Sequence, residues 1–189
     1  MKKFKPVIIV LIAVLAILGV FIYVAYKPQA ESAVTEPSTL SQIVDKDYTR
    51  NYPGSPRAVT QDYVNMIMFL YNEDYQQSDV TSIAKTARKI MDEELLGINS
   101  LDSQVKNLQK DVVNFRSKNE KIYSYTMPEL SEVQYFTYQG AECAGVKVSY
   151  FIKTKEGKFS KSFIQYLLRR DMDRKWKIYG YKEVTSDVK

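Results

Sequence analysis

The period of the hydrophobic pattern changes near Asn119, and this change most strongly limits the folds open to the chain. Before Asn119, apolar residues recur at steps of three and four, the period of an amphipathic helix. After Asn119, apolar and polar residues alternate, the period of a half-buried strand. Helices followed by strands predict an α+β domain, in which helices pack against a curved antiparallel sheet.

Three helices are predicted before the change. The first begins with Ser55 as N-cap and Pro56 in the first turn, and ends near residue 73. The second runs from Ser78 to a stop at Gly97, and the third begins near Ser100. Their apolar stripes are Val59, Tyr63, Met66, Ile67 and Leu70; Val80, Ile83, Ala84, Ala87, Ile90, Met91 and Leu95; and Leu101, Val105, Leu108, Val112 and Phe115.

Five strands are predicted after the change of period near Asn119. Residues 122–126 and 133–139 form short aromatic strands, and residues 145–153 form a strand with Val146, Val148, Tyr150 and Ile152 on one face. A turn that contains Gly157 leads to a central strand over 159–170, which is apolar on both faces. The closing strand follows a turn at 171–174. We expect it to place Trp176, Ile178 and Gly180 on the core side and Lys175, Lys177, Tyr179 and Tyr181 on the other.

Residues 7–26 form an uncharged apolar run of 20 residues. A helix of this length spans about 30 Å, the thickness of the bilayer hydrocarbon. The run exceeds the apolar region of a cleaved signal peptide, which favours a retained transmembrane anchor. Lys2, Lys3 and Lys5 precede it, which predicts a cytoplasmic N-terminus and a single-pass cell-membrane protein whose C-terminal domain is extracytoplasmic.

The predicted organisation has five parts. Residues 1–6 form a cytoplasmic tail, 7–26 the transmembrane helix, and 27–54 a flexible extracytoplasmic tether rich in proline and serine. Residues 55–184 form the α+β domain, and 185–189 a C-terminal tail.

The composition excludes several kinds of catalytic centre. The chain has no histidine, which removes Ser–His and Cys–His nucleophile pairs and the common zinc sites. Cys143 is the single cysteine, so no disulfide forms within the chain, and we expect it to be a buried strand residue. We therefore expect no catalytic residues, no cofactor and no metal ligands.

Carboxylates and tyrosines are the remaining candidates. The Asp92–Glu94 run is expected to lie on a solvated helix face, and Asp62 is expected to face solvent because it lies off the stripe of the first helix. Five tyrosines could line a cavity, although a core or interface position is the alternative for each of them. They are Tyr123, Tyr125, Tyr138, Tyr150 and Tyr166.

Charge is distributed unevenly along the chain. Residues 143–182 hold 11 basic and three acidic residues, whereas residues 28–120 hold 10 basic and 14 acidic residues. The basic strands are a candidate interaction surface; the alternative is that their lysines only solvate an exposed sheet. Four further basic residues flank the apolar run, so the formal charge of +5 does not predict nucleic-acid binding. The candidate surface is Lys175, Lys177, Tyr179, Tyr181, Lys147 and Lys153.

The order of elements, and the ending "LLRRDMD" followed by "WKIYGY", resemble the NTF2-like (cystatin-like) cone of three helices on a curved sheet. The segments "FLYNEDY", "ARKIMDEELLG" and "LRRDMDRKWKIYGY" resemble a family of single-pass membrane proteins from clostridial (Gram-positive) bacteria that has no assigned activity. An anchor followed by such a domain is also similar in architecture to VirB8-type proteins. These resemblances imply a fold and a location but no catalytic residues.

We therefore expect a non-catalytic role in interaction or assembly in the cell envelope. The expected partners are the lipid bilayer, through residues 7–26, and another envelope protein or a second copy of the chain. Two alternatives remain open: a small-ligand binder or enzyme that uses the apolar pocket of the cone, and a binder of anionic wall polymers through the basic sheet.

Overall fold

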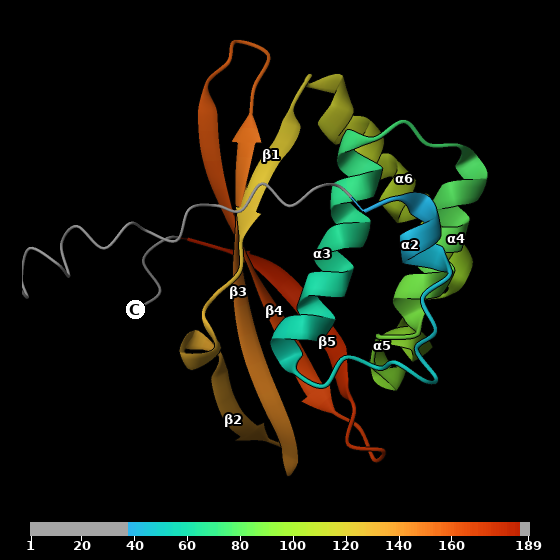
Figure 1. Ribbon diagram of the computed structural model, residues 1–189, viewed down its shortest axis with the longest axis vertical. Helices are drawn as coiled ribbons and strands as arrows, with labels where there is room; N and C mark the ends of the chain where they lie inside the picture. Colours follow the sequence, from blue (N-terminus) through green and yellow to red (C-terminus); the bar gives the residue numbers. More distant parts are fainter. Residues whose placement is uncertain (1–37, 186–189) are drawn as a thin grey trace, which may run out of the picture. The chain divides into compact units, whose positions relative to one another are not determined.

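The structure is a computed structural model, and it describes residues 38–185 of the chain. Five α-helices precede or flank one antiparallel sheet in this part of the chain (Figure 1). The helices are α2 (Leu40–Val44), α3 (Pro56–Asn72), α4 (Gln77–Arg88), α5 (Glu93–Ile98) and α6 (Leu101–Ser117). The strands are β1 (Lys121–Thr126), β2 (Gln134–Tyr138), β3 (Ala141–Lys153), β4 (Phe159–Arg170) and β5 (Trp176–Val184), with a 3-10 helix η1 (Leu130–Glu132) between β1 and β2.

The sheet is organised around the long strand β3. Its strand order is β1-β3-β4-β5, and β2 also pairs with β3. β1 pairs with the C-terminal part of β3, and β2 pairs with the N-terminal part, from Ala141 to Gly145. The segment 127–133, which includes η1, separates β1 from β2 along the same edge of β3.

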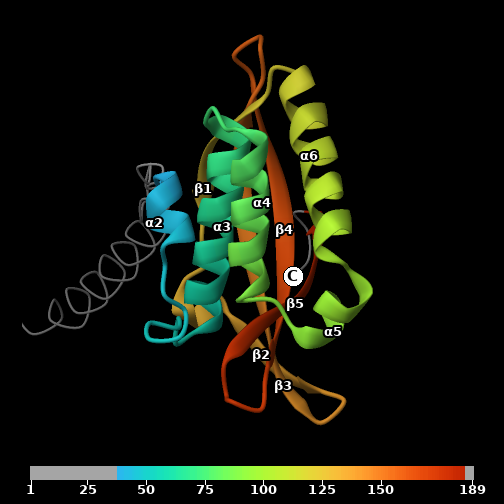
Figure 2. The same ribbon diagram turned by 90° about the vertical axis from the view of Figure 1, so that its right-hand side faces the viewer.

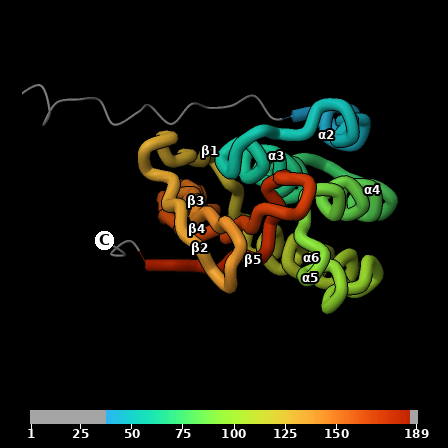
Figure 3. Tube along the Cα trace, turned by 90° about the horizontal axis from the view of Figure 1, so that it is seen from below, coloured from blue at the N-terminus to red at the C-terminus, as the bar shows by residue number. Residues whose placement is uncertain are grey.

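The α-helices lie on one side of the sheet (Figures 1 and 2). Figure 3, which looks along the vertical axis of Figure 1, shows the same two layers end-on. The core between them combines fully buried helix residues, such as Val59 and Leu70, with Val146, Val148 and Leu168 of the sheet. No described α-helix covers the opposite side, which we call the uncovered face; only the segment 127–133 lies against it.

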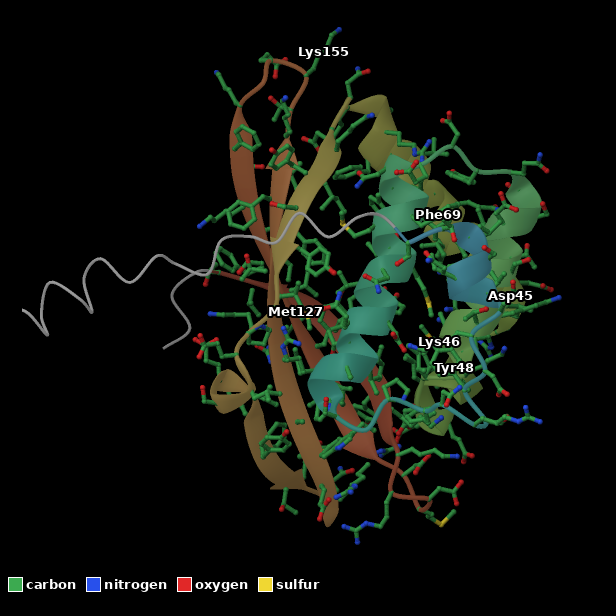
Figure 4. The ribbon with its side chains drawn as sticks, in the orientation of Figure 1. Asp45, Lys46, Tyr48, Phe69, Met127 and Lys155 are labelled. Carbon is green, nitrogen blue, oxygen red and sulfur yellow. The ribbon has the colours of Figure 1, made fainter. Side chains whose placement is uncertain are left out.

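Part of the predicted tether over 27–54 is folded. Its last part forms α2 and packs on the domain, because Ile43 and Tyr48 are buried there. Lys46 lies between them in the sequence, and its ammonium is 2.6 Å from the Asp62 carboxylate on α3 (Figure 4 labels Lys46 and Tyr48). The prediction that Asp62 faces solvent is therefore wrong.

The predicted second helix is divided in two. α4 ends at Arg88, because the next residues pair with the edge of β5. The Ile178 N–H donates to the Ile90 carbonyl at 2.9 Å, and the Asp92 N–H donates to the Ile178 carbonyl at 2.9 Å. The helical stripe of the sequence continues through this segment, but the chain turns at Lys89 and Ile90 and reaches the sheet edge at Met91, and α5 begins after Asp92. Three helices were expected, and the described part of the chain contains five.

A β-bulge in β5 changes which of its side chains lie on the helix-facing side of the sheet. The pairing of β4 with β5 shifts between Leu167 and Leu168, which leaves Tyr179 as the extra residue. Tyr181 then pairs with Tyr166 and shares its helix-facing side. The expected outward position of Tyr181 is therefore wrong.

The structure also changes the predicted fold class. None of the helices described between residues 38 and 185 is long and apolar enough to cross a membrane, and residues 7–26 lie outside the described part. Residues 1–6, 27–37 and 186–189 also lie outside it. We therefore retain an α+β domain with a curved antiparallel sheet, and we do not retain the predicted transmembrane helix or the predicted single-pass cell-membrane location.

Candidate functional site

A cavity of about 270 Å³ lies between α3, α6 and the helix-facing side of the sheet. We call it the tyrosine cavity, because five of its lining residues are tyrosines. Typical ligand pockets are about 300 Å³ or more, so this cavity lies near the lower limit for a small molecule. Its lining is Tyr63, Ile67 and Tyr71 of α3, Leu108, Asp111 and Phe115 of α6, and Ile122, Tyr150, Ile152, Ser162, Ile164, Tyr166 and Tyr181 of the sheet.

Three of the tyrosine rings form a cluster in the wall of the cavity. The ring of Tyr63 lies 5.8 Å from that of Tyr166 and 6.0 Å from that of Tyr181, and the last two are 5.8 Å apart. The hydroxyls of Tyr150 and Tyr166 share a hydrogen bond of 2.8 Å. The bulge at Tyr179 makes this cluster, because it turns Tyr181 toward the helices.

The helices supply a further part of the lining. Tyr71 packs edge-on against Phe115, with ring centres 4.9 Å apart. Asp111 follows Leu108 by three residues and precedes Phe115 by four, so the three share one side of α6. The Asp111 carboxylate is exposed and has no hydrogen bond or ion pair with any residue between 38 and 185.

Four phenols of the cavity are held in their neutral form. Burial raises the pKa of Tyr63, Tyr150 and Tyr166 above the ordinary value, and further contributions come from neighbouring tyrosines. Burial, followed by the negative charge of Asp111, raises the pKa of Tyr71 to about 12. These hydroxyls therefore remain hydrogen-bond donors at neutral and moderately alkaline pH.

The charges around the cavity are acidic. None of the lining residues is a lysine or an arginine, and Asp111 is the one carboxylate among them. A second carboxylate is close, since the Ser162 hydroxyl donates to Glu183 at 3.0 Å. The lining thus offers apolar surface, neutral hydroxyls and a negative charge.

A family model described as domain of unknown function (DUF6715) matches residues 1–181. The chain belongs to this family. No curated protein matches the sequence. The matched range includes every residue of the tyrosine cavity, from Tyr63 to Tyr181, so the cavity lies within the part of the chain that defines membership in DUF6715.

A second polar cluster of this DUF6715 domain surrounds Arg169 of β4. The guanidinium binds both oxygens of the Asp92 carboxylate, which is 3% exposed, and it binds Glu94 at 3.0 Å. Tyr179 donates to Glu94 at 3.1 Å, and the guanidinium lies 4.5 Å from the centre of the Tyr179 ring. The expected solvated face over Asp92–Glu94 is wrong for Asp92, which caps α5 and joins it to the sheet.

Two lysines of the predicted interaction surface, one just before β5 and one in it, lie against an aromatic ring. The ammonium groups of Lys175 and Lys177 are 5.6 Å and 4.7 Å from the centre of the Tyr52 ring. Lys177 also donates to the Lys89 carbonyl at 2.7 Å, and burial lowers its pKa. These two predicted residues are brought together, and they hold the segment before α3 against β5.

The other predicted residues occupy separate neighbourhoods. Tyr179 belongs to the Arg169 cluster and Tyr181 to the tyrosine cavity. Lys147 lies on the uncovered face, 5.7 Å from the Phe163 ring, and Lys153 lies 6.0 Å from the Phe159 ring. The six residues therefore do not gather into one basic surface, and an interaction through them stays a prediction.

The sequence identified part of the cavity. Tyr150 and Tyr166 were among the five tyrosines predicted to line one, and both do. The other three lie elsewhere: Tyr123 and Tyr138 are exposed, and the Tyr125 hydroxyl donates to Asn65. The residues missed by the prediction are Tyr63, Tyr71, Tyr181 and Asp111.

The uncovered face carries two adjoining hollows. One, of about 400 Å³, lies under the segment 127–133 and includes Lys147 and Phe163. The other, of about 520 Å³, includes Phe136 and Leu167. Both reach Gly145, where an added Cβ would lie 2.7 Å from the side-chain nitrogen of Gln165. Glycine at this position therefore permits the side chain of Gln165 to lie close over β3.

Proposed function

We propose that this domain is a non-catalytic binding module, which takes a small and partly apolar molecule into the tyrosine cavity. The observation that carries the proposal is the cavity itself, about 270 Å³ in volume beside a core in which many side chains are completely buried. A cavity of about 150 Å³ is large enough to hold a benzene molecule. The ligand that fits here is therefore somewhat larger than a single ring.

The chemistry of the lining favours binding over catalysis. The raised pKa values of Tyr63, Tyr150 and Tyr166 keep these phenols protonated, so they act as hydrogen-bonding groups and not as bases near neutral pH. Asp111 is exposed and has no nucleophile paired with it among the lining residues. We therefore propose that the ligand leaves the site chemically unchanged.

The arrangement also supports an NTF2-like interpretation of the fold. Helices precede an antiparallel sheet that curves around them, and the cavity opens between the two layers. This likeness is a proposal about architecture and supplies no ligand of its own.

A fragment screen tests the proposed function. Ligand-observed NMR on the full-length chain should detect binding of small neutral and charged aromatic or aliphatic compounds. Ser162→Phe, which fills the cavity from β4, should abolish this binding, whereas Ser131→Phe on the exposed η1 should not. If no compound binds, or if bound compounds are insensitive to Ser162→Phe, the proposal is wrong.

A second candidate function is self-association through the uncovered face. The specific observation is the pair of hollows over β3, with a 44% exposed Phe136 beside one and Lys147 in the other. Exposed aromatic side chains next to hollows are common in protein interfaces. Sedimentation of the full-length chain should show a dimer that Phe136→Ser and Lys147→Glu weaken. A monomer at all concentrations would remove this candidate.

A further inference from the structure

We infer that the tyrosine cavity selects an organic cation, with an alkylammonium group seated among its aromatic rings and near Asp111. The inference rests on the proposed function, because it names the class of ligand for the same site. It follows from three features of the lining: its rings, its charge and its size.

The rings come from the helices and from the sheet. Tyr63 of α3 forms one cluster with Tyr166 and Tyr181 of the sheet, and Tyr71 of α3 forms a second pair with Phe115 of α6. The face of an aromatic ring is electronegative, and a cation within about 6 Å of its centre is attracted to it. Proteins that recognise quaternary ammonium groups surround them with several such rings.

The charge of the lining favours the same class. Asp111 is an exposed carboxylate in the lining, and no described residue forms an ion pair with it. Glu183 lies next to the lining through its hydrogen bond from Ser162. No lysine or arginine lines the cavity, so an anionic ligand has no counter-charge there. The carboxylate of Asp111 therefore attracts a cationic ligand and repels an anionic one.

The neutral phenols add selectivity for a headgroup that carries a polar substituent. The Tyr150 and Tyr166 hydroxyls already bond to each other, and each phenol oxygen keeps a further hydrogen-bonding position. Choline, a trimethylammonium group with a short hydroxyl-bearing chain, has one more non-hydrogen atom than benzene and fits within a cavity of about 270 Å³. Choline is therefore a suitable probe.

Titration with choline and with its neutral isostere dimethylbutanol separates charge from shape. In the isostere a carbon atom replaces the ammonium nitrogen, and the rest of the molecule is unchanged. We expect calorimetry on the full-length chain to show that choline binds about tenfold more tightly than dimethylbutanol, the size of a partly desolvated cation–π interaction.

Two pairs of substitutions assign the preference to the rings and to the carboxylate. Tyr181→Leu should weaken choline binding about fivefold, whereas Tyr181→Phe should retain it because the ring remains. Asp111→Asn should weaken choline binding about threefold and leave dimethylbutanol binding unchanged, since the exposed charge is screened. Both positions are exposed, so these variants should fold.

The outcomes distinguish the inference from the proposed function. Equal affinity for choline and dimethylbutanol, or binding of neutral fragments in the cavity without binding of choline, would overturn the cation inference and leave a ligand-binding cavity. Failure of every compound, including the neutral fragments, would overturn both.

Discussion

The Arg169 cluster and the tyrosine cavity are two polar sites of one sheet, and they differ in how their groups are used. In the Arg169 cluster each charged group finds its partner within the domain: the guanidinium binds Asp92 and Glu94, and Tyr179 binds Glu94. In the tyrosine cavity the Asp111 carboxylate has no partner among the described residues, and space remains beside the phenols.

This difference in pairing assigns the Arg169 cluster to the stability of the fold and the tyrosine cavity to ligand binding. A buried charge that is fully paired stabilises the fold only while both partners remain. An unpaired carboxylate beside an open aromatic cavity contributes little to the free energy of folding, and it is available to interact with a bound ligand. Changes at Arg169 should therefore alter stability and spare binding, and changes at the rim of the cavity should do the reverse.

Alkaline pH should have the largest effect on the stability of the domain, and the tyrosines of the cavity contribute to it. Tyr63, Tyr71, Tyr150 and Tyr166 have pKa values raised above the ordinary 10.0, so their stabilising effect is complete below pH 10 and is lost as pH rises through the raised values. The unfolded chain then loses protons that the folded chain keeps, and stability falls by up to about 1.4 kcal/mol per pH unit for each tyrosine. Urea unfolding at pH 9, 10 and 11 measures this fall, and a flat profile would contradict it.

Removal of Arg169 should cause the largest loss among single substitutions. Arg169→Met leaves the 3% exposed Asp92 without its partner, which should lower the free energy of unfolding by about 3 kcal/mol. The matched control is Arg174→Met in the exposed turn, which should change stability by less than about 0.5 kcal/mol. Equal effects of the two variants in urea unfolding would show that the Arg169 cluster has no structural role.

The hydroxyl pair in the cavity wall should have an intermediate effect. Tyr150→Phe leaves the buried hydroxyl of Tyr166 without its partner at 2.8 Å, at a cost of about 1–2 kcal/mol. The double variant Tyr150→Phe/Tyr166→Phe should recover part of this loss, because no unpaired hydroxyl remains. Additive losses in thermal or urea unfolding would argue against the hydrogen bond, and Tyr123→Phe at an exposed position serves as the control.

The contact between Asp62 and the segment before α3 should have the smallest effect. The Asp62 carboxylate pairs with the Lys46 ammonium at 2.6 Å and accepts a hydrogen bond from the Tyr48 hydroxyl at 3.2 Å. Asp62→Asn removes the negative charge, which should lower the free energy of unfolding by about 1 kcal/mol. Asp45→Asn is the control, since Asp45 is exposed. Addition of 1 M salt should reduce the difference between wild type and Asp62→Asn, and no difference at low salt would contradict the contact.

Elements with local signals were predicted well from the sequence. The Ser55-Pro56 start of α3, the Ser100 cap of α6 and the alternation in β3 are encoded within a few residues, and each lies where expected. The break after α4 has no local signal, because Ile90 and Met91 continue its apolar stripe. Their backbone pairs with Ile178, which lies far along the chain, so only the folded sheet shows the break.

The candidate site was predicted less completely for the same reason. Tyr181 reaches the cavity through a one-residue bulge, and alternation alone assigns it to the other face. Asp111 carries a weak signal, because it lies beside Val112 and on the side of α6 that holds Leu108 and Phe115. A carboxylate at the margin of an apolar helical stripe is usually solvated, and the cavity next to it is visible only once α6 packs on the sheet.

The most direct test of the account uses the tyrosines themselves as reporters. NMR spectra of the full-length chain, carbon-13-labelled in its tyrosine rings and assigned by single Tyr→Phe variants, should be followed during titration with choline and dimethylbutanol. The account predicts shifts at the cavity tyrosines Tyr63, Tyr71, Tyr150, Tyr166 and Tyr181, larger with choline, and none at the exposed Tyr123, Tyr135 and Tyr138. Unmoved cavity tyrosines, or shifts confined to the exposed ones, would contradict it.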